Sequence, residues 1–244
     1  MRLGVIADVH GNALALEAVL DRMDRLSLDM TVNLGDCASG PLWPAEATKI
    51  LRDSGFRHVR GNHDRAMGAQ TDTGLGLSDA YAWQSLDQDA RHWLSSLPFS
   101  LVLDGVSCFH ATPASDETYL METVTGGRLQ PAPPVEIASR LGAATARLIL
   151  CGHSHQPRLA QLADGTVIVN PGSIGCPAYD DATTPAHVSE SGSPHARFAV
   201  VTIHGGEIAV EHHAVTYDWA RAAQRAAENG RPEWAHALLT GTAL

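Results

Sequence analysis

The stretch Leu3-Gly4-Val5-Ile6-Ala7-Asp8-Val9-His10-Gly11-Asn12 joins a short apolar run to two side chains of metal-binding type. The apolar run favours a buried β-strand. Asp8 and His10 stand two residues apart, so both side chains can point to the same side of an extended strand end. Because ligands bind at the carboxyl ends of strands in α/β sheets, this stretch predicts an α/β protein with a site at one sheet edge.

The same strand-helix order continues through the first hundred residues. The pattern predicts a second strand at Met30–Leu34, a helix that opens at Pro44 and a short strand around His58-Val59. Helices between strands imply a parallel sheet. Apolar spacing predicts buried helix faces at Leu16, Val19, Leu20, Met23 and Leu26, and in one longer helix at Trp83, Leu86, Ala90, Trp93, Leu94 and Leu97, ended by Pro98.

The second half of the chain carries hairpin signals instead. Two-residue turns between apolar runs predict antiparallel pairs at Asp104-Gly105, Asp164-Gly165 and Gly205-Gly206. Two polar stretches, Gln70–Gly76 and Asp180–His195, are expected to be loops. We expect a single domain over residues 1–244, with a tail of two short helices at about 218–240 that is broken at Gly230-Arg231-Pro232.

Composition excludes several partner classes. With 17 basic against 27 acidic residues, the formal net charge is −10, which repels phosphate backbones, so no stable nucleic-acid duplex is expected. No run of about 18 apolar residues is present to span a bilayer, and the N-terminus resembles a strand rather than a signal peptide. We therefore expect a cytoplasmic protein without membrane contact, whose four scattered cysteines are reduced.

Chemistry-bearing residues follow five separate strand-like runs. In chain order they are Asp8-Val9-His10-Gly11-Asn12, Gly35-Asp36, Gly61-Asn62-His63-Asp64, His110, and Gly152-His153-Ser154-His155. Strand ends of one sheet share an edge, so we expect these segments to converge on one crevice. Oxygen and imidazole ligands suit Mn, Fe, Zn, Ni or Co, and a lone carboxylate such as Asp36 is suited to bridging two ions.

These motifs resemble those of the calcineurin-like metallophosphoesterases, specifically the small bacterial and archaeal phosphoesterase branch. The resemblance runs from Arg2 to about Gly175 and includes Phe109-His110-Ala111-Thr112-Pro113 and Asn170-Pro171-Gly172-Ser173. It implies a four-layer α/β/β/α sandwich of two mixed β-sheets flanked by helices. It also implies two divalent transition-metal ions, for which we expect Mn, with Fe, Zn, Ni or Co as alternatives.

The resemblance also assigns roles to residues. Asp8, His10 and His155 would hold the first metal ion, and Asn62, His110 and His153 the second, with Asp36 bridging both. His63 would contact the phosphate and help the leaving group depart, and Asp64 would orient His63. Asn12, Asn62, His63 and Arg65 are the expected substrate contacts.

The activity implied is hydrolysis of phosphodiester or phosphoanhydride bonds in small, nucleotide-like substrates by a metal-bridging hydroxide. Gly35-Asp36 continues as Cys37-Ala38-Ser39-Gly40-Pro41, without the further Asp and Arg of phosphoprotein phosphatases, which argues against that class. Cys176 stands where relatives often carry Gln. Two alternatives are a phosphomonoesterase and, because a retromer subunit has the same fold, a non-catalytic scaffold. A homo-oligomer is left open.

Overall fold

The apolar run that opens the chain forms β1 (Arg2–Ile6), the middle strand of the first sheet, in the computed structural model, which describes residues 1–244. β1 pairs in parallel with β2 (Met30–Asn33), and β2 with β3 (Arg57–His58), which confirms the predicted parallel unit. On its other side β1 pairs antiparallel with β13 (Ala196–His204), and β14 (Glu207–Val215) completes the order β14-β13-β1-β2-β3.

The second sheet has the order β4-β5-β8-β10-β9. Its strands are β4 (Ser100–Leu103), β5 (Val106–Phe109), β8 (Leu148–Leu150), β9 (Arg158–Gln161) and β10 (Val167–Asn170). β4 with β5, β9 with β10, and β13 with β14 are antiparallel pairs, as the three turn signals predict. β8 pairs in parallel with both β5 and β10, so the sheet is mixed.

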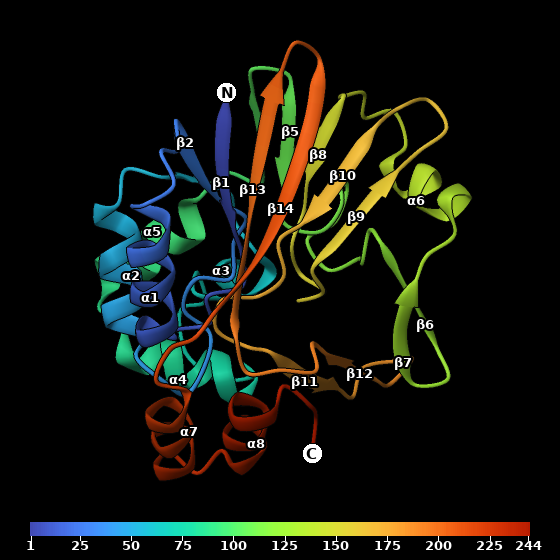
Figure 1. Ribbon diagram of the computed structural model, residues 1–244. Coiled ribbons are helices and arrows are strands. Elements are labelled where there is room, and N and C mark those ends of the chain that lie inside the picture. The colour runs from blue at the N-terminus through green and yellow to red at the C-terminus, as the bar shows by residue number, and fades with distance from the viewer.

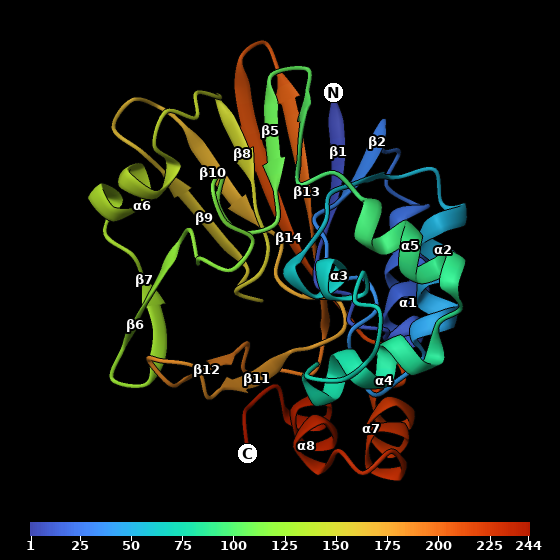
Figure 2. The same cartoon turned by 180° about the vertical axis from the view of Figure 1, so that it is seen from behind.

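Helices cover the outer faces of both sheets. α1 (Ala13–Met23), α2 (Pro44–Asp53) and α5 (Gln88–Ser96) lie beside the first sheet, and α6 (Pro134–Leu141) beside the second (Figures 1 and 2). The alternation along β1 explains the layering: Leu3 and Val5 enter the core between the sheets, whereas Ile6 enters the core under the helices. The predicted four-layer α/β/β/α sandwich is confirmed.

A third sheet, of order β11-β12-β7-β6, was not expected. It contains β6 (Glu122–Thr125), β7 (Arg128–Pro131), β11 (Ala178–Asp181) and β12 (His187–Glu190), so the prediction of a loop over Asp180–His195 was wrong. The buried residues of β12 are His187 and Ser189, which leaves no alternation of apolar and polar side chains for the sequence to reveal. Gln70–Gly76, by contrast, contains neither helix nor strand, as expected.

The single long helix predicted up to Pro98 is two helices, α4 (Leu77–Ser85) and α5. Leu86 is extended, with φ −99° and ψ 141°, and the Asp87 carboxylate caps α5 by accepting the Ala90 N–H at 2.7 Å. The apolar spacing runs on across this break because Trp83, Leu86 and Leu94 pack against one core. Apolar periodicity therefore did not reveal the break.

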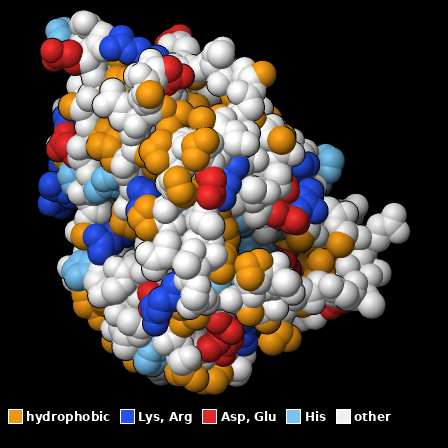
Figure 3. Space-filling model, turned by 90° about the vertical axis from the view of Figure 1, so that its right-hand side faces the viewer, with side chains coloured by type: hydrophobic (Ala, Val, Ile, Leu, Met, Phe, Trp, Pro, Cys, Tyr) orange, Lys and Arg blue, Asp and Glu red, His pale blue; other side chains and the backbone are white.

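The remaining helices are α3 (Asn62–Ala66), α7 (Trp219–Glu228) and α8 (Pro232–Thr240). The two helices expected in the tail are present, and α8 lies against β11 (Figure 1). None of the helices has both the length and the apolar character needed to cross a bilayer. On the face seen in Figure 3, basic side chains are interspersed with acidic ones.

Replacing the cap residue tests the helix break. Asp87→Ala leaves the first N–H groups of α5 without their side-chain acceptor, and we expect it to lower the free energy of unfolding by about 1 kcal/mol in urea denaturation. Gln88→Ala, at the exposed neighbouring position, is the control and should change stability by less than about 0.5 kcal/mol. Equal losses in the two variants would show that Asp87 does not act as a cap.

Candidate metal centre

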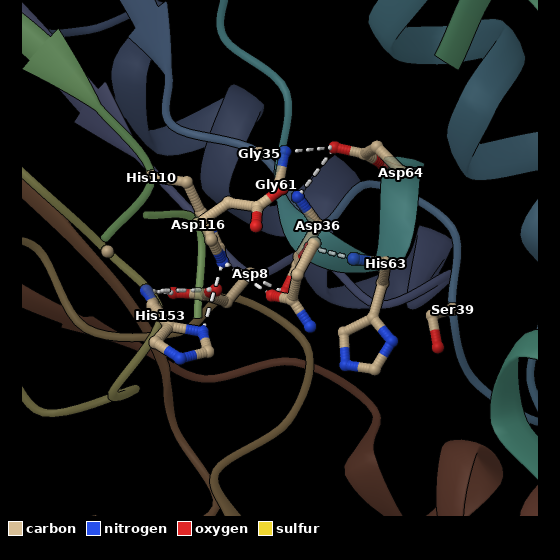
Figure 4. A network of polar contacts seen from close by, with 12 residues as sticks. Asp8, Gly35, Asp36, Ser39, Gly61, His63, Asp64, His110, Asp116 and His153 are labelled. Atoms are coloured by element: carbon tan, nitrogen blue, oxygen red, sulfur yellow. Dashed lines mark hydrogen bonds and ion pairs between the residues drawn. The ribbon is translucent and has the colours of Figure 1, made fainter. Parts of the chain in front are cut away.

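The predicted metal ligands lie where strands end. Asp8 and His10 follow β1, and Asp36 follows β2. Asn62 begins α3 just after β3, His110 follows β5, and His153 and His155 follow β8. The structure brings these residues together from both sheets, and Figure 4 shows Asp8, Asp36, His110 and His153 side by side. The expected convergence of distant segments therefore occurs.

The side chains form two groups of metal-binding geometry. The first group contains Asp8, His10 and His155, and the second contains Asp36, His110 and His153. Within each group the ligand atoms lie within 4.8 Å of one another. Asp36 Oδ2 lies 3.2 Å from His110 Nε2 and 3.9 Å from His10 Nε2, between the groups. Asn62 Oδ1 is 3.1 Å from His110 Nε2. This arrangement is consistent with a dinuclear metal site.

In each of the four histidines, one ring nitrogen faces the other candidate ligands, and we call it the inner nitrogen. The other ring nitrogen, the outer one, donates a hydrogen bond to a backbone carbonyl. The pairs are His10 Nδ1 with Ser39 O at 2.7 Å, His110 Nδ1 with Leu34 O at 2.7 Å, His153 Nε2 with Glu117 O at 2.9 Å, and His155 Nδ1 with Cys176 O at 2.7 Å. A carbonyl only accepts, so the proton is on the outer nitrogen and, in a neutral ring, the inner nitrogen carries a lone pair. Metal-binding histidines are held in this way.

The close approach of the inner nitrogens shows whether metal ions would fit between them. His10 Nε2 and His155 Nε2 lie 3.1 Å apart, although neutral rings point two lone pairs at each other there. Burial lowers the pKa of His10 to about 4, and burial together with the nearby His110 lowers that of His153 to about 3, so these rings stay neutral near pH 7. A cation shared by the facing nitrogens removes the repulsion. The donor set therefore fits divalent metal ions.

The backbone at this site is strained. Five of the seven non-glycine residues with positive φ in the chain are candidate ligands, with φ between 49° and 69°. They are Asp8, His10, Asp36, His153 and His155. Non-glycine residues rarely adopt this left-handed conformation, and such strain concentrates at functional sites.

A cavity of about 890 Å³ opens in front of the two groups. His10, Asp36, Asn62, His63, His153 and His155 line it on the metal side. The third sheet, the segment before it and α8 also line the cavity, through residues for which the sequence offers no motif: Tyr119, Tyr179, Asp181, His187 and Trp234. Only the tertiary structure reveals this enclosure.

Comparison with known proteins now identifies the family, because residues 1–193 match the model of the calcineurin-like phosphoesterase superfamily domain. The chain belongs to this superfamily. The uncharacterized protein MJ0912 of Methanocaldococcus jannaschii is 26% identical over 257 residues, covering 95% of this chain and 94% of that protein.

Two solved structures share the fold of this chain over nearly their whole length. A metallophosphoesterase from Sphaerobacter thermophilus is 24% identical with a TM-score of 0.74, and 99% of each chain is covered. The hypothetical protein PH1004 from Pyrococcus horikoshii is 19% identical with a TM-score of 0.76, covering 100% of this chain and 99% of that one. The aligned residues therefore include those of the third sheet and the C-terminal helices.

Asp64 does not orient His63, contrary to the expectation. Its carboxylate accepts the backbone N–H groups of Asp36 at 2.8 Å, Cys37 at 2.9 Å and Gly61 at 3.0 Å, and so ties two ligand loops together. Figure 4 shows the Asp64 carboxylate turned away from the His63 ring. The short helix α3 points the two successive side chains in different directions.

The carboxylate that contacts His63 belongs to Asp79, near the start of α4. His63 Nδ1 lies 2.8 Å from Asp79 Oδ1. Burial lowers the pKa of His63, but the nearby Asp36 and the hydrogen bond to Asp79 outweigh it and raise the pKa to about 9. The sequence alone made Asp79 look like an ordinary solvated helix charge, because nothing local connects it to His63.

Two predicted substrate contacts are engaged elsewhere. Asn12 is buried: its Oδ1 accepts the Ala15 N–H at 3.1 Å and so caps α1, and its amide group donates to Gly175 O and Tyr217 Oη. Arg65 is paired with Asp116 and Glu117. Neither side chain lines the cavity, whereas Asn62 and His63 do.

Metal content tests the dinuclear arrangement. We expect the protein, loaded with a transition metal and then desalted, to hold about two ions per chain by elemental analysis. Asp36→Asn should reduce the content at both positions because Asp36 lies between the two groups. Asp53→Asn on the exposed side of α2 is the charge-matched control. At most one ion per chain, together with an Asp36→Asn variant that binds normally, would contradict a dinuclear site.

Proposed function

We propose that this protein is a dinuclear metal-dependent phosphoesterase that hydrolyses phosphodiester or phosphoanhydride bonds in small, nucleotide-like substrates. The observation that carries the proposal is the pair of candidate ligand groups, one of which contains Asp36, beside a cavity that His63 also lines. A non-catalytic scaffold has no need for strained ligand residues or for a histidine held beside them.

Seven residues would hold the metal ions. Asp8, His10 and His155 would bind the first ion, and Asn62, His110 and His153 the second, with Asp36 shared. We propose Mn, with Fe, Zn, Ni or Co as alternatives, since imidazole and carboxylate ligands suit all of them. Bound there, two ions would polarise phosphoryl oxygens and lower the pKa of a water molecule towards neutrality.

His63 would supply a proton to the departing oxygen. Asp79 accepts from His63 Nδ1, while His63 Nε2 has no hydrogen-bond partner within the protein and the ring lines the cavity. The raised pKa of His63 keeps Nε2 protonated near pH 7. Bound metal cations would lower the pKa of His63 again and bring it closer to neutral pH, where a general acid works best.

The arginines favour a diester over a monoester. A monoester dianion needs more positive compensation than a diester monoanion. Arg140 and Arg231 are the only arginines that line the cavity, and each is already paired, with Glu136 and Glu233 respectively. Arg65, the remaining candidate beside the motifs, is paired with Asp116. No free guanidinium is therefore available to neutralise a second phosphate charge.

Removal of His63 tests its assigned role. We expect His63→Ala to retain its metal content and fold but to lower kcat by about two to four orders of magnitude, because it removes leaving-group help rather than a ligand. Asp79→Asn should lower kcat by a smaller factor with unchanged metal content. His153→Ala is the contrasting variant and should lose metal. Equal metal loss in His63→Ala and His153→Ala would show that His63 binds metal rather than helping the leaving group depart.

A pair of model substrates tests the reaction class. In one Mn-loaded preparation, we expect kcat/KM for bis(p-nitrophenyl) phosphate to exceed that for p-nitrophenyl phosphate, because the cavity offers little compensation for a dianion. A chelator should abolish both activities. A monoester preference of about tenfold or more, equivalent to about 1.4 kcal/mol, would favour a phosphomonoesterase instead.

A further inference from the structure

One wall of the cavity is aromatic and is built by the third sheet and the segment before it. Tyr119 precedes β6, Tyr179 belongs to β11 and His187 to β12. The Tyr119 ring stacks on His153 with centroids 4.8 Å apart, and Tyr179 meets His155 edge-on at 4.7 Å. Because the wall touches one histidine of each metal group, a substituent on a phosphate bound at the metals would reach these rings.

The hydrogen bonds of this wall run in one direction when the His187 ring is neutral. His187 Nδ1 lies 2.8 Å from Pro185 O, which can only accept, so in the neutral ring His187 Nε2 is an acceptor. Tyr119 Oη, 2.8 Å from His187 Nε2, therefore donates to it. Tyr179 Oη, 2.8 Å from Tyr119 Oη, in turn donates to Tyr119.

This chain of hydrogen bonds leaves only acceptors facing a ligand. Tyr179 Oη has given its single proton to Tyr119, so its free lone pairs can accept but it cannot donate. A phosphate oxygen, which needs donors, would find none in these two hydroxyl groups.

The charge of the wall also disfavours a second phosphate group. Asp181 lies in the strand of Tyr179, lines the cavity and belongs to no ion pair, although its Oδ1 accepts the Thr183 N–H at 2.8 Å. Glu117, which also lines the cavity, is paired with Arg65. The unbalanced charge beside the aromatic rings is therefore negative, which disfavours a second phosphate group and attracts a cation.

We propose that this wall, formed by Tyr119, Tyr179, Asp181 and His187, is a subsite for a positively charged, hydrogen-bond-donating substituent, so that the preferred substrates are phosphodiesters carrying an ammonium group. The inference rests on the proposed phosphoesterase function and narrows it. It places polyphosphate substrates below such diesters, because the extra anionic groups would face acceptors and a carboxylate.

A matched substrate series tests the subsite. Three p-nitrophenyl phosphodiesters share one leaving group and differ only in the second substituent, which is 2-aminoethyl, ethyl or carboxymethyl. We expect kcat/KM to fall in that order, with at least about a tenfold difference between the first and the last, a factor of ten being about 1.4 kcal/mol. A carboxymethyl ester that is hydrolysed as well as the aminoethyl ester would overturn the proposal.

Two variants locate the effect. Asp181→Asn keeps the size of the side chain and should reduce the ratio of aminoethyl to carboxymethyl kcat/KM by about threefold or more. Asp21→Asn, on the exposed side of α1, makes the same charge change away from the cavity and should leave the ratio unchanged. An unchanged ratio in Asp181→Asn, or an equal change in Asp21→Asn, would contradict a local subsite.

Binding without turnover separates this inference from the proposed function. Isothermal titration calorimetry of the metal-loaded protein should show phosphoethanolamine binding about tenfold or more tightly than phosphoglycolate. If no diester is hydrolysed but this binding order holds, the phosphoesterase proposal fails and the subsite stands. If diesters are hydrolysed but phosphoglycolate binds equally well or better, the subsite fails and the phosphoesterase proposal stands.

Discussion

The left-handed backbone of the candidate ligands is the constraint on which the rest of this structure depends. Five ligand residues with positive φ each store about 1 kcal/mol or more of strain. Their loops hold that conformation through backbone contacts between strand ends, such as Asp8 N–H with Gly35 O at 3.0 Å and His10 N–H with Asp36 O at 2.9 Å. The sheets therefore act as a rigid frame that turns side chains inward after each strand.

Close packing of the ligand loops depends on two glycines and one carboxylate. A Cβ on Gly61 would lie 2.0 Å from Asp36 Oδ1, and one on Gly35 would lie 2.4 Å from Gly61 N, so neither position accepts a larger residue without movement. Asp64 joins the same loops by accepting three backbone N–H groups. The Gly35-Asp36 and Gly61-Asn62-His63-Asp64 segments thus set the geometry of the loops as well as supplying candidate ligands.

The third sheet and the C-terminal helices complete the site from outside the sandwich. Asn229 and Arg225, in and just after α7, donate to Tyr81 Oη on α4, and Arg231 donates to Ser78 Oγ. Both acceptors flank Asp79, the residue hydrogen-bonded to His63. The tail therefore supports the helix that positions His63, while β11 and β12 form the wall that we propose selects the substituent.

The parallel start and the hairpins could be predicted from the sequence, because apolar periodicity and turn chemistry are local. The motifs after the strand-like runs indicated which residues meet at the strand ends, and the four layers were implied by the family resemblance that those motifs carry. The sequence did not reveal the partner of His63, the engagement of Arg65 and Asn12, or the third sheet. Asp79 reaches His63 only through the fold of the chain between α3 and α4. The buried residues of β12 are His187 and Ser189, so no apolar alternation marks it as a strand. Hydrogen-bond partners and cavity walls are set by distances through space, so only the tertiary structure decided them.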